Sequence, residues 1–123
     1  MIVGSVNARG ESGVRLRLTG PTGQSEEILA VVDTGFNGAL ALPPTLVAWL
    51  PLVKKQSAKV RLADAESRLV DRYVVQVLWD GEPRDVLAFA MGEMSLIGIA
   101  LLEGHRLTID MVDGGPVTIE PLG

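Results

Sequence analysis

The most informative stretch of this sequence reads Ala30-Val31-Val32-Asp33-Thr34-Gly35. An acidic residue that ends an apolar strand lies at the rim of the core, where backbone amides of the next turn can hold its carboxylate. Thr34 adds a hydroxyl beside it, and Gly35 lets another chain approach the backbone closely. The same tripeptide also fits an ordinary turn in which Asp33 bonds to its own backbone. The stretch by itself therefore leaves a catalytic and a structural interpretation open.

Alternating apolar and polar residues on both sides of this stretch predict half-buried strands. Val14–Thr19 is the clearest case, and the turn at 20–23 returns the chain into Glu27–Val32 as a hairpin. Further strands are expected at Leu40–Leu42, Lys59–Leu62, Leu69–Leu78, Arg84–Ala90, Arg106–Asp110 and Val117–Glu120. Short helices are expected at Thr45–Leu50 and Ile99–Glu103. About eight short strands and two short helices predict an all-β fold, a closed or nearly closed barrel.

The composition excludes several classes of active site. The chain has 123 residues, no Cys and one His, His105, so zinc fingers, Cys nucleophiles, disulfide scaffolds and multi-histidine metal centres lack their residues. Carboxylate, hydroxyl and lysine chemistry remain, and no metal or cofactor is expected. The length fits one domain over residues 1–123, since no linker divides it.

Charge and hydropathy argue against two kinds of partner. A formal net charge of -4 disfavours nucleic acid, because counterion release needs clustered Lys and Arg. One basic cluster exists and is interpreted as a solvated loop leading into a strand: Lys54, Lys55, Lys59 and Arg61. The apolar runs are far shorter than the roughly 20 residues that span a bilayer. Without an apolar leader at the N-terminus, a cytoplasmic protein is expected.

The order of these segments resembles the retropepsin-like aspartic proteases of clan AA. An apolar strand runs into Asp33-Thr34-Gly35, a short strand ends in Pro43-Pro44, and a polar hairpin tip precedes Leu96-Ile97-Gly98 and a short helix. Leu101–Asp110 resembles the helix and closing strand of small single-domain bacterial and archaeal members, to which the similarity is greatest. The resemblance covers roughly Glu27–Asp110, about two-thirds of the chain. It implies that the Asp-Thr-Gly is a catalytic loop and that the Leu-Ile-Gly strand crosses behind it.

Catalysis of this kind implies an aspartic endopeptidase, which needs two carboxylates sharing one proton. The ionised carboxylate takes a proton from a water, and the neutral one donates to the scissile carbonyl of an extended peptide or unfolded protein. This sequence offers a single Asp-Thr-Gly, so we expect a two-fold homodimer in which each subunit contributes Asp33. The resemblance implies that Thr34 side chains interlock beneath the carboxylates, and it makes Met1–Val6 and Val117–Leu122 candidates for the dimer interface.

A flap is expected to hold the peptide over the two carboxylates and to exclude water. The resemblance places this flap at Leu62–Ser67, with substrate contacts from Leu62, Ala63, Asp64 and Ala65. Viral relatives carry glycines at this place, so the sequence leaves room for a stiffer or more open flap.

The residues after the Asp-Thr-Gly depart from the family pattern. Many aspartic proteases have Ala, Ser or Thr where this chain has Phe36, which cannot bond to the catalytic carboxylate. Phe36 either lines a substrate pocket or packs under the loop, and Asn37 and Gly38 are candidates for holding the substrate backbone. Phe36 and the glycine-poor flap also support an alternative function: a catalytically inactive binding or dimerisation module that kept the barrel.

Overall fold

The structure, a computed structural model, describes residues 1–61 and 66–123. Within these residues the chain forms twelve strands and two short helices. The strands are β1 (Ile2–Val6), β2 (Ser12–Thr19), β3 (Ser25–Val32), β4 (Leu40–Leu42), β5 (Val53–Lys54), β6 (Ala58–Arg61), β7 (Ser67–Val70), β8 (Arg72–Trp79), β9 (Glu82–Ala90), β10 (Ser95–Ile97), β11 (His105–Ile109) and β12 (Pro116–Pro121). The helices are α1 (Pro44–Trp49) and α2 (Ile99–Leu102).

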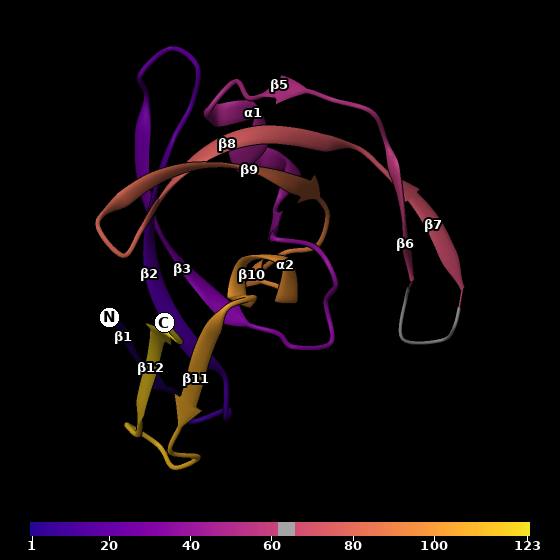
Figure 1. Cartoon of the computed structure of the whole chain (residues 1–123). Coiled ribbons are helices and arrows are strands. Elements are labelled where there is room, and N and C mark those ends of the chain that lie inside the picture. The colour runs from indigo at the N-terminus through magenta and orange to yellow at the C-terminus, as the bar shows by residue number, and fades with distance from the viewer. Residues whose placement is uncertain (62–65) are drawn as a thin grey trace.

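Six of these strands close into a barrel, which confirms the predicted all-β fold (Figure 1). Around the barrel, in the described part of the chain, the strand order is β2, β3, β10, β4, β9 and β8, and β8 returns to β2. The closing contact is short, because β8 pairs only with Arg17–Thr19 of β2. Nearer the N-terminal end of β2, the same edge pairs with β1, at Ser12 and Gly13.

Alternation along the strands explains why the barrel has a filled interior. On β2, the buried side chains Val14, Leu16 and Leu18 alternate with the exposed Arg15 and Arg17. β8 follows the same rule, with Val75 and Val77 buried on either side of the exposed Gln76. Other fully buried side chains of the core come from β4 and β10: Leu40, Leu42 and Ile97. Burying such a side chain contributes about 1.5–3 kcal/mol to the folded state. The interior is thus a packed core, and binding chemistry belongs to its rim.

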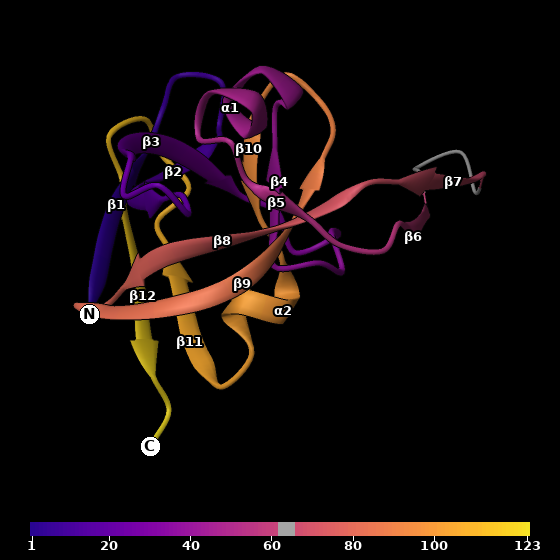
Figure 2. The ribbon, with the colours of Figure 1, turned by 90° about the horizontal axis from the view of Figure 1, so that it is seen from above.

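The predicted strand over Leu69–Leu78 is wrong as a single element. The structure divides it into β7, which ends at Val70, and β8, which starts at Arg72. Asp71 lies at the break, and its carbonyl oxygen accepts a hydrogen bond from the N–H of Ala90. β6 and β7 therefore form a separate two-stranded hairpin, which projects away from the barrel in Figure 2.

Proline sets the start of α1, as the sequence predicts. Pro44 is at the first helical position and Pro43 precedes it, while Val47 is the buried residue of the helix. α2 buries Leu101 and Leu102 against the core. Within the described residues, neither helix has the length and apolar character needed to cross a membrane.

His105 has a structural position at the start of β11. Its Nε2 accepts a hydrogen bond from the indole N–H of Trp79 at 3.1 Å, and its Nδ1 lies 2.9 Å from the carbonyl oxygen of Glu103. A carbonyl only accepts, so Nδ1 carries the proton and both ring nitrogens are used. His105 thereby ties β11 to Trp79, which is buried at the end of β8.

Candidate active site

The loop that follows β3 holds the Asp-Thr-Gly at an open rim of the barrel. The N–H of Asp33 donates to the carbonyl oxygen of Ile97 at 2.8 Å, so the parallel pairing of β3 and β10 continues one residue beyond the strand. The N–H of Gly35 donates to Asp33 Oδ1 at 2.9 Å. Asp33 is half-buried, whereas Thr34 and Gly35 are exposed. One carboxylate oxygen is therefore held by the loop itself, on a surface that stays open.

The Leu-Ile-Gly segment and the start of α2 are both hydrogen-bonded to this loop. The N–H of Ile99 donates to Phe36 O at 2.9 Å, and the N–H of Ala100 donates to Gly38 O at 3.1 Å. A Cβ atom on Gly98 would collide with Gly38 O and would lie 2.6 Å from Phe36 Cδ2. Only glycine lets the two segments approach this closely.

Phe36 packs beneath the loop, which is one of the two positions left open by the sequence. It is 6% exposed, and its ring meets the ring of Phe89 edge to face at a centroid distance of 5.5 Å. Around it lies a second apolar cluster whose buried members include Ala41, Val60 and Val70. Val60 and Val70 come from β6 and β7, so this cluster joins the loop to the root of the hairpin.

Gly38 makes room for this aromatic pair. A Cβ atom there would lie 2.6 Å from the Phe36 ring and 2.7 Å from the Phe89 ring. Gly38 is buried, whereas Asn37 beside it is exposed. Of the two candidates for holding a substrate backbone, Asn37 has the accessible side chain.

The expected flap corresponds to the hairpin of β6 and β7. Its predicted contact residues Leu62, Ala63, Asp64 and Ala65 lie outside the described residues. At the hairpin root, Ser57 Oγ donates to Asp71 Oδ1 at 2.7 Å, and Lys54 Nζ lies 3.4 Å from Asp71 Oδ2. The Ser57 hydroxyl, followed by the positive charge of Lys54, lowers the pKa of Asp71 below its ordinary value of 3.8.

Acid should loosen the root of this hairpin. Because the pKa of Asp71 is lower in the folded chain, the stabilisation from its carboxylate is present above the ordinary value of 3.8 and is lost as the pH falls through the lowered pKa. We expect the amide of Lys55, which donates to Arg72 O at 2.7 Å, to lose protection below that range, measured as its exchange rate relative to an unstructured peptide at the same pH.

The Asp71→Asn variant provides the comparison. Its Lys55 amide should exchange faster than that of the unmodified chain even at neutral pH, because the Asn has no carboxylate. Glu27→Gln is the matched control, because Glu27 lies 3.7 Å from Arg15 and 3.8 Å from Arg17 on the barrel. An unchanged exchange rate of Lys55 in Asp71→Asn would show that the carboxylate does not hold the hairpin root.

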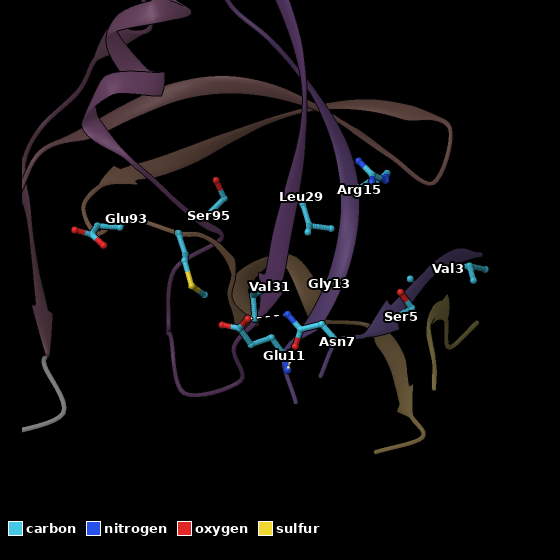
Figure 3. Close-up of a pocket in the computed structure, with 12 residues that line it drawn as sticks. Val3, Ser5, Asn7, Glu11, Gly13, Arg15, Leu29, Val31, Glu93 and Ser95 are labelled. Atoms are coloured by element: carbon cyan, nitrogen blue, oxygen red, sulfur yellow. Dashed lines mark hydrogen bonds between the residues drawn. The ribbon is translucent and has the colours of Figure 1, made fainter. Parts of the chain in front are cut away.

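A groove of about 540 Å³ follows the outer face of β3 (Figure 3). Leu29 and Val31 line it, and they share their face of the strand with Asp33 because successive side chains alternate. Gly13 forms part of its floor, since a Cβ atom there would lie 3.0 Å from Leu29 Cδ1. Figure 3 shows the Asn7–Glu11 hydrogen bond, 2.8 Å long, near Val31. The groove therefore combines the apolar side chains of β3 with the charged side chains of Glu11, Arg15 and Glu93.

Two further hollows flank the loop, and Asn37 lines both. The first, of about 550 Å³, lies between the loop, α2 and β11; its lining includes Thr34, Ile99 and Leu107. The second, of about 470 Å³, lies toward the hairpin; its charged lining residues are Lys59, Arg72 and Asp85. These neighbours come from distant parts of the chain, so sequence reasoning missed them. Among the residues described, no three carboxylate or imidazole groups converge on a metal position.

Comparison with known proteins defines the class of fold. No protein-family model and no curated protein sequence matches the chain. The crystal structure of a retropepsin-like aspartic protease from Rickettsia conorii is similar with a TM-score of 0.59, over 99% of this chain and 91% of that chain, at 18% sequence identity. The protein therefore has the retropepsin-like fold, as its sequence predicts.

Proposed function

We propose that this protein is an aspartic endopeptidase, active as a homodimer in which each subunit supplies one Asp33. The observation that carries the proposal is the position of Asp33. It is fixed by the Gly35 N–H and the Ile97 carbonyl at the open rim of a retropepsin-like barrel, with Thr34 and Gly35 exposed beside it. One such loop supplies one of the two carboxylates, and its exposed face leaves room for the loop of a second subunit.

The chemistry needs both carboxylates, because each has a different task. Two carboxylates in contact cannot both be charged, so they share one proton. The ionised group takes a proton from a water, whose oxygen bonds to the scissile carbonyl carbon, and the neutral group gives its proton to the carbonyl oxygen. When the resulting diol collapses, the C–N bond breaks: the carboxyl that took the proton of the water gives it to the leaving nitrogen, and the other carboxylate takes a proton from a diol hydroxyl, which restores the starting pair. The Gly35 N–H at Oδ1 of Asp33 leaves Oδ2 for the shared proton.

An extended polypeptide is the substrate that these surfaces favour. The groove along β3 offers Leu29 and Val31 to apolar side chains, and Asn37 offers an exposed amide to a peptide backbone. Such a substrate must be unfolded locally, because a folded chain has already used its backbone hydrogen-bonding groups.

A statine-type peptide, whose hydroxyl imitates the diol, should bind the dimer at least ~100-fold more tightly than the same peptide lacking that hydroxyl. The hydroxyl contacts both carboxylates, so the difference should vanish in the Asp33→Asn variant. Calorimetric titration of both peptides into both proteins measures it. Equal binding of the two peptides by the unmodified protein would favour the inactive binding module instead.

A further inference from the structure

Positive charge gathers in one part of this otherwise acidic chain. Residues 54–72, which include the hairpin of β6 and β7, contain six of the eleven basic residues and three of the fifteen acidic ones. This segment therefore carries a formal charge of +3, while the remaining five basic and twelve acidic residues give -7. The hairpin projects from the barrel in Figure 2. A substrate that lies beside it meets a local charge opposite in sign to the net charge of the chain.

Two of these basic side chains line the hollow of about 470 Å³ between the Asp-Thr-Gly loop and the hairpin. Lys59 belongs to β6 and Arg72 is the first residue of β8, so the hollow extends from the hairpin to the barrel. Val86, Leu87 and Phe89 of β9 give it an apolar wall. A side chain in this hollow can place its methylene groups against the apolar wall and its charged group toward the two cations.

Arg72 is held in place by its neighbours. Its carbonyl oxygen accepts a hydrogen bond from the N–H of Lys55 at 2.7 Å, and on β9 it pairs with Phe89. Its Nε donates to the carbonyl oxygen of Gln56 at 2.8 Å, which orients the guanidinium group. Among the described residues, no carboxylate forms an ion pair with Arg72 or Lys59. The terminal nitrogens of Arg72 are thus oriented and available to an incoming carboxylate.

One carboxylate of the chain itself, that of Asp85, also lines the hollow. It is exposed on β9, opposite Gln76 of β8. Two cations and one anion leave the hollow with a net positive charge. A negatively charged side chain of a substrate is therefore attracted there, whereas Lys or Arg is repelled.

The hollow begins where a substrate backbone meets the Asp-Thr-Gly loop. Asn37 lines it, is exposed, and lies four residues after Asp33. Because side chains of an extended peptide project to both sides of its backbone, a peptide held at Asn37 can direct one of them into the hollow. The position of Asn37 connects the charge of the hollow to the choice of substrate.

We propose that this hollow selects an acidic side chain of the substrate, whose carboxylate contacts Arg72 and Lys59 together. The inference rests on the proposed function, because the side chain belongs to the peptide that the Asp33 carboxylates cleave. Arg72 acts from the barrel and Lys59 from the hairpin, so a bound acid also joins the hairpin to the barrel. A homodimer presents the hollow twice, which favours acidic residues on both sides of the cleaved bond.

A library of unstructured peptides measures this selection. Each position in turn carries Glu, Gln or Lys, and mass spectrometry identifies the cleaved products. We expect Glu to raise kcat/KM about tenfold over Gln at the positions that reach the hollow, and Lys to lower it. High salt should reduce the preference, because Lys59 is exposed. Equal cleavage of Glu and Gln peptides at every position would overturn the proposal.

Substitutions assign the preference to the hollow. The quantity compared is the ratio of kcat/KM for the Glu peptide to that for the Gln peptide, because a loss of folded protein lowers both values alike. Lys59→Gln and Arg72→Gln should each lower this ratio about threefold, and Asp85→Asn should raise it. The matched control is Arg84→Gln, which removes an exposed cation of β9 from outside the hollow. An equal fall of the ratio in Arg84→Gln and Arg72→Gln would show that net charge, and not the hollow, selects the acid.

Binding measurements separate the hollow from the proposed activity. Calorimetry with the Asp33→Asn variant gives the Kd of the Glu and Gln peptides without cleavage. If the unmodified chain cleaves both peptides equally and Asp33→Asn binds both equally, the acidic selection is wrong while the peptidase proposal stands. If Asp33→Asn binds the Glu peptide more tightly and a further Arg72→Gln removes the difference, the selection stands, even where the unmodified chain cleaves nothing and the peptidase proposal is wrong.

Discussion

Asp33→Asn should reduce peptide hydrolysis by about 10⁴-fold or more, because an amide cannot accept the proton of the attacking water. The substitution is close to isosteric. Its side-chain oxygen can still accept the Gly35 N–H, which lies 2.9 Å from Oδ1 in the present loop. The fold and the dimer should therefore persist, as circular dichroism and sedimentation would verify. Cleavage of a peptide library at an unchanged rate would exclude Asp33 as a catalytic residue.

Mixing the unmodified chain with the Asp33→Asn variant shows whether one active site is shared between two subunits. If subunits exchange at random and each dimer needs two Asp33 carboxylates, a ninefold excess of Asp33→Asn should leave about a tenth of the activity of the same amount of unmodified chain. A site complete within one subunit would keep its full activity.

Gly98→Ala should destabilise the fold by about 3 kcal/mol or more. The added Cβ would collide with the Gly38 carbonyl oxygen, which is backbone and cannot rotate away, and would lie 2.6 Å from the ring of Phe36. Relief of the collision requires the loop to separate from β10, which should also reduce activity. Denaturant unfolding of the variant measures the change in the free energy of unfolding.

Gly23→Ala is the matched control for this substitution. Gly23 has φ +84, and no atom lies within 4 Å of the place that a Cβ would occupy, so only the backbone conformation opposes the methyl group. We expect a cost of about 1 kcal/mol there. A similar loss of unfolding free energy in Gly98→Ala and Gly23→Ala would show that the collision at Gly98 is relieved without damage to the fold.

Local patterns in the sequence predict the barrel better than they predict its short elements. The hairpin of β2 and β3 follows from strict alternation and a Gly-Pro turn, and both strands appear where expected. The break at Asp71 is missed because apolar residues continue on both sides, while the break depends on Ser57 and Ala90 from elsewhere in the chain. β10 has three residues, too few for a periodic signal.

The candidate site, too, is predicted from the sequence only in part. The Asp-Thr-Gly and Leu-Ile-Gly segments are recognisable because each is contiguous, and the structure brings them into contact. The burial of Phe36 depends on Phe89, a residue from β9, together with the missing side chain of Gly38. The hollow beside Thr34 likewise combines α2 with β11. Contacts of this kind arise from tertiary packing, which no local pattern encodes.

The self-contained hydrogen bonding of the Asp-Thr-Gly loop has a consequence for control of the protein. Gly35, Asp33 and Ile97 complete the loop within a single subunit, so association needs no ordering of this segment. If the proposed homodimer is the active form, a lone subunit holds only one of the two carboxylates and cleaves no peptide. On the same proposal, hydrolysis at low concentration should rise with the square of the amount of chain present, so modest changes in synthesis or turnover would change the rate of hydrolysis strongly.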